Sequence, residues 1–173
     1  MTSSVLRLWT IQPEATWSRW ERTGYLWSSW RYAPTEWRRP YRWMAAALAR
    51  KIEPPTKSAA PVWAWFQFRD AARKKPDLRW AGHLKSGTRG VRVELVLSPS
   101  SVLLSDFDLW HYVLNNWALD DGSGSRRRNW SRIFDLDFAL EDIARVRSRK
   151  AIQAVFWTAP LSAVADLDSF VAR

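Results

Sequence analysis

The sequence predicts an α+β fold, with helices packed on a central β-sheet that is antiparallel or mixed and either continuous or split. Apolar or alternating segments typical of strands lie at residues 5–11, 62–68, 91–97 and 152–158. Patterns typical of helices lie between them, at residues 15–22, 41–52 and 107–119. Because strands and helices do not alternate regularly, a doubly wound parallel fold is excluded. The chain of 173 residues suits a single domain over residues 1–173.

The first strand and the first helix form one predicted unit. Residues 5–11, VLRLWTI, are mostly β-branched or apolar and favour a buried strand. Pro13 and Glu14 stand where a helix begins, and Gly24 ends it because glycine accepts the left-handed backbone of a helix C-terminus. After an aromatic segment expected to be a loop or a short helix, Pro40 opens a second helix rich in alanine.

The middle of the chain combines a strand with a long loop. Residues 62–68, VWAWFQF, alternate so that Trp63, Trp65 and Gln67 share one face. That face suits stacking of a planar ring and hydrogen bonding to it, or simply packing under other elements. Residues 69–90 carry proline and glycines and predict an exposed loop, and loops of this length are often functional.

The last third is expected to return to the sheet. A Gly/Ser loop at residues 120–128 precedes two predicted helices, at 129–138 and 140–149. Residues 152–158, IQAVFWT, predict a late strand that Pro160 closes. The remaining tail is expected to form a helix or an edge strand.

The composition excludes several kinds of chemistry. Cysteine is absent, which excludes disulfides, cysteine nucleophiles and thiolate metal sites. Only two histidines, His83 and His111, are present, so no metal site is expected. The apolar runs fall short of the roughly 20 residues of a membrane helix, and the N-terminus lacks the pattern of a secretory signal. We expect a cytoplasmic protein without a membrane partner.

The charge points to an anionic partner. Lys and Arg number 27 against 17 Asp and Glu, a net charge of +10, which favours nucleic acid, another phosphate-rich molecule or an acidic protein. Arg126, Arg127 and Arg128 follow the Gly/Ser loop and are candidate nucleic-acid contacts. The alternative is a solvated charge run.

The chain is unusually rich in tryptophan, with 14 in total. Many of those near the N-terminus are interleaved with arginines, which could form an aromatic and cationic platform for bases. The other interpretation is that the rings pack between helices and sheet, with arginine stems lying over them.

The segment LLSDFDLWHYVLN, residues 103–115, is the strongest candidate for a chemical site. On a helix, Asp108, His111 and Asn115 form one polar stripe. In a functional interpretation, Asp108 orients His111, which acts as a base or binds a substrate hydroxyl, and Asp106 stands near the pocket mouth. In the structural alternative, Ser105 is the N-cap and His111 is a core histidine with its hydrogen bonds satisfied.

Residues 91–97, VRVELVL, supply one more candidate. Arg92 and Glu94 share a face of this strand and could bind a phosphate or a ribose. Alternatively they form the solvent face of an edge strand. No glycine-rich phosphate loop and no HExxH motif is present, which removes the common nucleotide and zinc-protease interpretations.

Several segments together resemble the bacterial family called domain of unknown function 3841. They are LWTIQ with the helix that ends in Gly24, VWAWFQF, VRVELVLSPSSVLLSDFDLWHYVLN, the FDLD of IFDLDF, and IQAVFWTAPLSAV. The resemblance runs from about Leu8 to Arg173, and LLSDFDLWHYVLN is its most specific part. The family carries no assigned activity, so it implies no reaction.

A more distant resemblance is to the ADP-ribosyltransferase fold. It rests on the strand LWTI, the helix ending in glycine, the central strand pair and a last strand QAVF followed by a proline. That fold binds NAD in a cleft between two sheets and includes toxins that modify nucleic acids and small RNA phosphotransferases. The resemblance implies NAD as cofactor, bound by Thr10, Gln12, Trp65, Gln67 and Gln153.

Two positions depart from that fold's pattern. A transferase of this type has Glu two residues after the last-strand Gln, where this chain has Val155, and His or Arg where it has Thr10. Either the acid comes from Glu94, Asp106 or Asp108, or NAD chemistry is absent. The resemblance implies an ADP-ribosyltransferase-like enzyme or toxin that acts with NAD on a nucleic acid or other phosphate-rich target. The alternative is a non-enzymatic basic domain that binds nucleic acid or a partner protein, such as an antitoxin.

Overall fold

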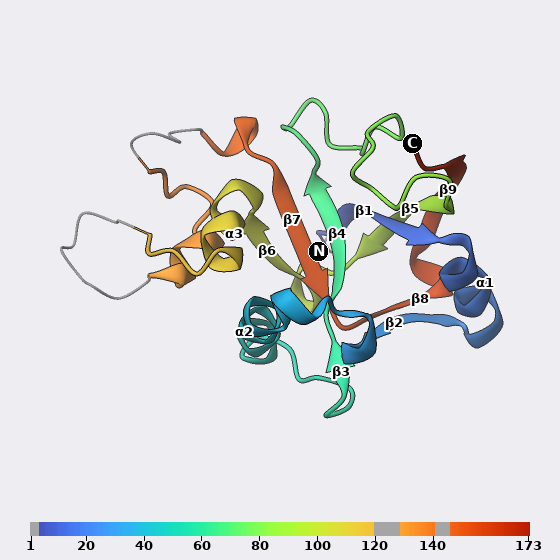
Figure 1. Cartoon of the computed structure of the whole chain (residues 1–173), viewed down its shortest axis with the longest axis horizontal. Coiled ribbons are helices and arrows are strands. Elements are labelled where there is room, and N and C mark those ends of the chain that lie inside the picture. The colour runs from blue at the N-terminus through green and yellow to red at the C-terminus, as the bar shows by residue number, and fades with distance from the viewer. Residues whose placement is uncertain (1–3, 120–128, 141–145) are drawn as a thin grey trace.

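The computed structural model describes residues 4–119, 129–140 and 146–173, and within them the strands form two sheets (Figure 1). The six-stranded sheet has the order β6 (Leu103–Asp106), β7 (Ile152–Phe156), β4 (Val62–Gln67), β1 (Leu6–Pro13), β5 (Arg89–Leu97) and β9 (Val164–Val171). The three-stranded sheet has the order β3 (Ala59–Ala60), β2 (Tyr25–Ser29) and β8 (Thr158–Pro160). Every pair of neighbouring strands is antiparallel, so the antiparallel sheet is confirmed, and it is split.

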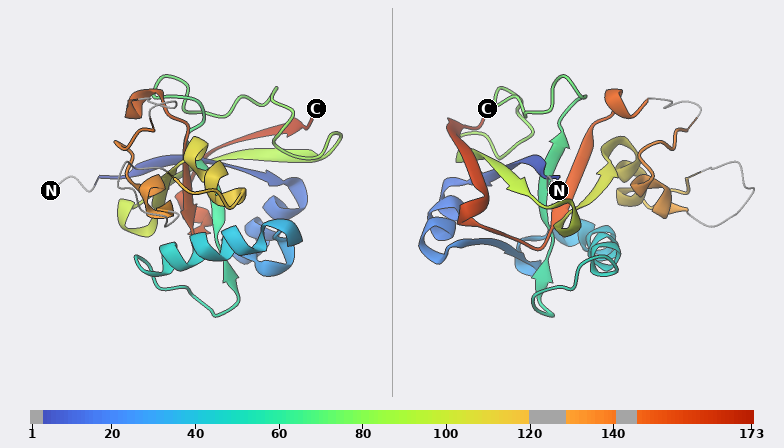
Figure 2. Two further views of the ribbon diagram at one scale, coloured as in Figure 1. Left: turned by 60° about the vertical axis from the view of Figure 1, so that its left-hand side comes forward. Right: turned by 180° about the vertical axis from the view of Figure 1, so that it is seen from behind.

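Helices complete the α+β fold that the sequence predicts. The α-helices of the described residues are α1 (Glu14–Thr23), α2 (Arg38–Ala49) and α3 (Phe107–Leu114). The views in Figures 1 and 2 place α1 and α3 on either side of the central strands β4 and β7. The chain passes directly from one sheet to the other at two places, because only Pro61 separates β3 from β4 and only Trp157 separates β7 from β8.

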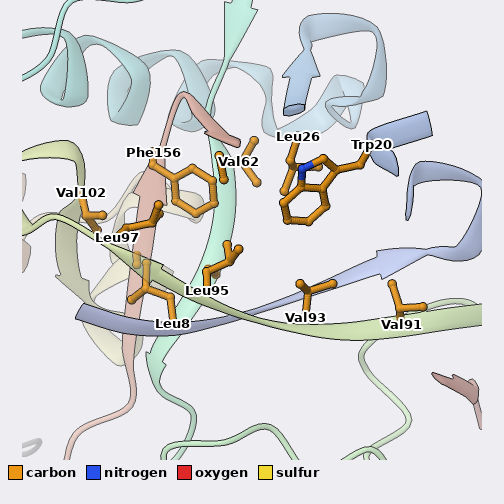
Figure 3. Close-up of a cluster of buried hydrophobic side chains, with 13 residues drawn as sticks. Leu8, Trp20, Leu26, Val62, Val91, Val93, Leu95, Leu97, Val102 and Phe156 are labelled. Carbon is orange, nitrogen blue, oxygen red and sulfur yellow. The ribbon is translucent and has the colours of Figure 1, made fainter. Parts of the chain in front are cut away.

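Two apolar clusters lie on opposite faces of the larger sheet, as alternation along β7 shows. Ala154 and Phe156 belong to the first cluster, which includes Trp20 of α1 and Leu26 of β2. Figure 3 shows this group of side chains gathered in one interior space. Val155 belongs to the second cluster, which α2 and α3 cover. Both faces of β7 are therefore buried, which accounts for a strand that is apolar at every position except Gln153.

The strand, helix and glycine at the N-terminus form as predicted. Pro13 directly precedes α1, and Gly24 ends it with φ of 79° while its N–H donates 2.8 Å to the carbonyl of Trp20. The chain then reverses into β2, so the conformation of Gly24 sets where the smaller sheet begins.

We therefore expect Gly24→Ala to lower the free energy of unfolding by about 1–2 kcal/mol, because a Cβ is disfavoured in the left-handed region. A Cβ at this position meets no atom within 4 Å, so the cost is one of backbone conformation alone. Urea denaturation measures it. Gly24→Asn is the matched control and should lose less, since Asn tolerates this region; equal losses for Ala and Asn would contradict the explanation.

Some predicted elements are corrected by the structure. The aromatic segment after Gly24, expected to be a loop or short helix, begins with β2, which exists because it pairs with β8 and β3. Residues 129–138 do not form an α-helix but the 3-10 helix η4 (Trp130–Phe134). Asp135 then takes an extended backbone and accepts the N–H of Asp137 at 3.2 Å, an alternative to helical bonding that Asp favours.

The helix in LLSDFDLWHYVLN is shorter than predicted and begins with a different cap. It ends at Leu114 because Asn116 adopts φ of 60°. Asp106, not Ser105, is the N-cap and accepts the N–H of Leu109 at 3.1 Å, while Ser105 belongs to β6. The predicted helix at 140–149 falls partly outside the described residues, and its end forms the 3-10 helix η6 (Arg147–Arg149).

The C-terminal strand determines whether β5 is an edge strand or an interior strand of the larger sheet. The tail forms β9, an edge strand, as one of the two expected outcomes. Because β9 covers it, β5 is an interior strand, and Arg92 and Glu94 are not on the solvent face of an edge. Arg92 instead forms an ion pair with Asp168 of β9 at 2.6 Å.

Candidate functional site

One pocket lies where the larger sheet meets the smaller one, and we call it the inter-sheet pocket. It has a volume of about 460 Å³. Its walls come from the end of β1, from α1, β2 and α2, and from the start of β4. The side chains that carry most of its chemistry are Gln12, Arg19, Ser29, Tyr32 and Trp63. Both size and composition, aromatic rings with a few polar groups, are typical of small-molecule sites.

The end of β1 positions Gln12 in this pocket. Gln12 Nε2 donates a 2.7 Å hydrogen bond to Thr10 Oγ1, and that hydroxyl donates 2.9 Å to the carbonyl of Trp63. Thr10 is fully buried and does not line the pocket. Of these two predicted cofactor contacts, Gln12 therefore lines the pocket. Thr10 does not line it, but its hydroxyl accepts the hydrogen bond that positions the Gln12 amide.

A cationic rim borders the pocket on the side of α1. The Arg19 guanidinium lies 4.5 Å from the centroid of the Trp27 ring and donates 3.0 Å to Tyr32 Oη. Arg31 also donates to Tyr32 Oη, at 2.5 Å. The hydrogen bond from Arg31, together with that from Arg19, lowers the pKa of Tyr32. The rim is thus suited to an anionic group such as a phosphate.

Another part of the pocket lining is aromatic and carries hydroxyl groups. Tyr41 of α2 lies against Trp63 of β4, with ring centroids 5.1 Å apart. Burial, together with the negative charge of Glu36, raises the pKa of Tyr41, so its phenol is neutral near pH 7 and can donate a hydrogen bond. Ser29 Oγ is buried without a hydrogen-bond partner among the described residues. This part of the lining offers rings for stacking and hydroxyls for hydrogen bonding.

A second site, the aromatic cleft, lies beyond the other end of β4 and has a volume of about 600 Å³. Four rings line it, and each meets the next edge to face. The centroid distances are 4.7 Å for Phe107 and Trp65, 5.1 Å for Trp65 and Phe68, and 5.6 Å for Phe68 and Trp80. The rings come from α3, β4 and the loop before β5, so three distant segments build this cleft.

Charged side chains stand among these rings. Arg69, Arg73 and Arg149 line the cleft together with Asp70 and Asp108. Asp70 is neutralised by Arg73, which also lowers the pKa of that carboxyl. Arg69 and Arg149 form no side-chain hydrogen bond or ion pair within the described part of the chain. Both are exposed and available to an anionic ligand.

The loop before β5 fixes Trp80 over the cleft. A Cβ on Gly82 would lie 2.3 Å from Trp80 Cη2, which is too close for any side chain. The Trp80 ring can therefore occupy this position only because residue 82 is glycine. His83 Nε2 is 2.8 Å from the Asp77 carbonyl oxygen, and its ring lies 5.0 Å from that of Trp80. Burial lowers the pKa of His83, so the imidazole is neutral near pH 7.

The stripe predicted in LLSDFDLWHYVLN does not line a pocket as a unit. His111 is exposed, and its Nδ1 lies 2.9 Å from the Phe107 carbonyl oxygen one turn earlier, so it is not a core histidine. Asn115 Nδ2 donates 2.8 Å to the His111 carbonyl. Asp108 lines the aromatic cleft. Asp106 is buried and forms an ion pair with Lys150 at 3.0 Å.

The remaining candidates are engaged inside the fold. Glu94 accepts 3.1 Å from Trp9 Nε1 and pairs with Arg7. Gln67 donates 3.0 Å to the Lys150 carbonyl, and Gln153 donates 3.0 Å to Ser105 Oγ. Of the five residues assigned to NAD, Gln12 thus lines the inter-sheet pocket, Trp65 the aromatic cleft, and Thr10, Gln67 and Gln153 neither.

Three further predictions concern charge, metals and membranes. Arg126, Arg127 and Arg128 lie outside the described residues. Within the described ranges, no three acidic or histidine side chains group as metal ligands do. No helix there has the length and apolar character needed to span a membrane.

Comparison with known families identifies the chain at the level of a family. A family model described as Domain of unknown function (DUF3841) matches residues 7–128. The chain belongs to this family. The match includes LLSDFDLWHYVLN but ends before IFDLDF and IQAVFWTAPLSAV, so it is shorter than the resemblance predicted. No curated protein and no solved structure matches the chain.

For this DUF3841 member, sequence reasoning missed several residues that the two sites bring together. Arg19, Tyr32 and Ser29 of the inter-sheet pocket were not predicted as site residues, although Arg19 belongs to the tryptophan and arginine pattern. Trp80 and Arg149 of the aromatic cleft were missed as well. For Trp80 the available signal was the exposed loop at 69–90, whose length is typical of functional loops.

Proposed function

We propose that this DUF3841 protein is ADP-ribosyltransferase-like and binds NAD in the inter-sheet pocket, to act on a nucleic acid or other phosphate-rich target. The observation that carries the proposal is the position of the pocket. It lies between two antiparallel sheets, with Gln12 at the end of the first strand on its wall. A cleft between two sheets is where the ADP-ribosyltransferase fold holds NAD.

The chemistry of the walls supports a dinucleotide. Tyr41 and Trp63 offer flat surfaces for a nicotinamide or adenine ring, and Gln12 and Ser29 offer hydrogen bonds to its polar edge. Arg19 supplies a cation for the pyrophosphate. In transfer, the bond between the ribose C1′ and nicotinamide breaks, nicotinamide leaves, and the target nucleophile bonds to C1′ while losing its proton.

The experiment measures binding and chemistry separately. Isothermal titration calorimetry gives the Kd for NAD, and chromatography follows nicotinamide release with RNA or DNA present. Arg19→Ala should raise the Kd roughly 10- to 100-fold, the loss of one charge-assisted hydrogen bond. Arg22→Ala is the matched control, since Arg22 is exposed on the same helix and does not line the pocket. Unmeasurable NAD binding, or equal Kd values for both variants, would contradict the proposal.

A second candidate is a non-enzymatic binding domain, and one observation favours it. None of the described residues that line the inter-sheet pocket is acidic, whereas ADP-ribosyl transfer uses a carboxylate to stabilise the ribosyl cation. The resemblance expects that carboxylate at Val155, which is fully buried in the second apolar cluster. Absence of nicotinamide release, together with nucleic-acid binding that weakens as the salt concentration rises, supports this candidate. The toxin form of the first proposal has its own test. Expression of the wild-type protein should arrest the growth of the host cells, and expression of the Arg19→Ala variant should not.

A further inference from the structure

The aromatic cleft has features that the proposed function does not use. It lies beyond the opposite end of β4 from the inter-sheet pocket, and no residue that the structure describes lines both. Trp80 keeps 44% of its surface exposed although its ring is large and apolar. Exposed rings grouped in a cleft are typical of a binding surface. We propose that this cleft binds single-stranded nucleic acid by stacking bases on Trp65 and Trp80.

The arrangement of the rings fits bases. Phe68 meets both tryptophans edge to face and is itself buried, so it acts as a rigid spacer between them. Phe107 braces Trp65 from the other side at 4.7 Å. The two tryptophans are thereby held in place before any ligand arrives, which lowers the entropic cost of stacking. Stacking on aromatic rings accepts any base, because every base has a π-face.

The charges fit a phosphate backbone. Arg69 and Arg149 enter the cleft from two different segments, the loop between β4 and β5 and η6. Neither side chain forms a hydrogen bond or ion pair within the described residues, and the Arg69 guanidinium lies 6.0 Å from the centroid of the Phe68 ring. Arg73 adds a third guanidinium, whose charge Asp70 balances, and Asp108 is the second carboxylate among the described lining residues. The protein as a whole carries +10, which draws a polyanion toward it.

Single strands fit better than the other anionic macromolecules. In a duplex the bases stack on each other, so the rings of the cleft would have no faces to contact. An acidic peptide would satisfy the arginines but leaves the row of rings without a specific role. Single-stranded nucleic acid would be a target class for the proposed transferase. Binding to the aromatic cleft does not depend on NAD, however, because the cleft and the inter-sheet pocket are separate.

The test uses the full chain without NAD. Fluorescence anisotropy follows labelled single-stranded RNA and DNA of about 12 nucleotides, within the roughly 4–16 that such sites cover. Trp80→Ala should raise the Kd about 5- to 150-fold, the loss of one stacked base. Trp37→Ala is the matched control, because Trp37 is 42% exposed and lies outside the cleft. Arg149→Ala should lower the salt dependence of binding by about one phosphate contact.

Gly82→Ala gives a second, independent variant. It keeps every ring and every charge but places a methyl group against Trp80, so the ring must move from its place. Weaker binding by Gly82→Ala with an unchanged circular dichroism spectrum supports the inference. Equal Kd values for wild type, Trp80→Ala and Trp37→Ala would overturn it, as would duplex or an acidic peptide binding as tightly as single strands. Failure of NAD binding alone would leave these results unchanged.

Discussion

Lys150→Met should lower the free energy of unfolding by about 3–5 kcal/mol, one of the two largest effects we expect from a single substitution. Lys150 Nζ lies 3.0 Å from the Asp106 carboxylate and donates 2.5 Å to the Phe138 carbonyl, and the side chains of this pair are only 2% and 4% exposed. Removing the cation leaves a buried carboxylate without its partner, and that loss dominates. Urea denaturation followed by circular dichroism measures it.

Arg89→Ala is the control for this substitution. The Arg89 and Glu14 side chains form an exposed ion pair, 74% and 49% accessible, which should contribute about 0–1 kcal/mol. A loss below about 1 kcal/mol for Lys150→Met would contradict the role of the buried pair. Because Asp106 also caps α3, which carries Phe107 and Asp108 into the aromatic cleft, Lys150→Met should weaken nucleic-acid binding as well.

Trp20→Ala should also cost about 3–5 kcal/mol, since it empties a fully buried ring site in the first apolar cluster. The ring packs edge to face on Trp17 at 5.3 Å. One effect opposes the loss: Trp20 Nε1 is buried without a hydrogen-bond partner in the described structure, so its removal relieves a desolvation cost of about 1–3 kcal/mol. The cavity is the larger of the two effects.

Trp20→Phe separates these contributions. It keeps an aromatic ring in the cluster and removes the unpaired donor, so its loss should be clearly smaller than that of Trp20→Ala. Trp80→Ala is the comparison for an exposed tryptophan and should change stability by less than about 1 kcal/mol. Equal losses for Trp20→Ala and Trp80→Ala would show that burial does not decide which tryptophans stabilise the fold.

The tryptophans show how much of a side chain's role can be predicted from its neighbours in the sequence. Their dominant use in the described structure is packing: Trp20, Trp63 and Trp110 belong to or border the apolar clusters. In the N-terminal region Trp9 and Trp20 are buried, as the packing interpretation expects, and the Arg19 guanidinium lies over the Trp27 ring. We instead propose base stacking at Trp65 and Trp80, two residues that the sequence analysis did not pair.

The candidate site was harder to predict than the fold, because its residues meet only in three dimensions. Asp108 and Trp65 were both predicted, for different roles, and the cleft brings them together with Arg149. His111 fits the pattern of a site histidine equally well, yet the turn of α3 directs it to solvent. Spacing along a helix tells which residues share a face, but not what that face meets.

The sequence by itself determined the elements whose signals are local: the strand at 62–68, the strand at 91–97, and the helix that Gly24 ends. Alternation and a required backbone conformation depend on residues only a few positions apart, so no partner is needed to recognise them. Only the tertiary structure decided that β2 exists, that Asp106 rather than Ser105 caps α3, and that two separate pockets flank β4. These features depend on hydrogen bonds and packing between segments distant in the chain, and such contacts leave no periodic trace in sequence.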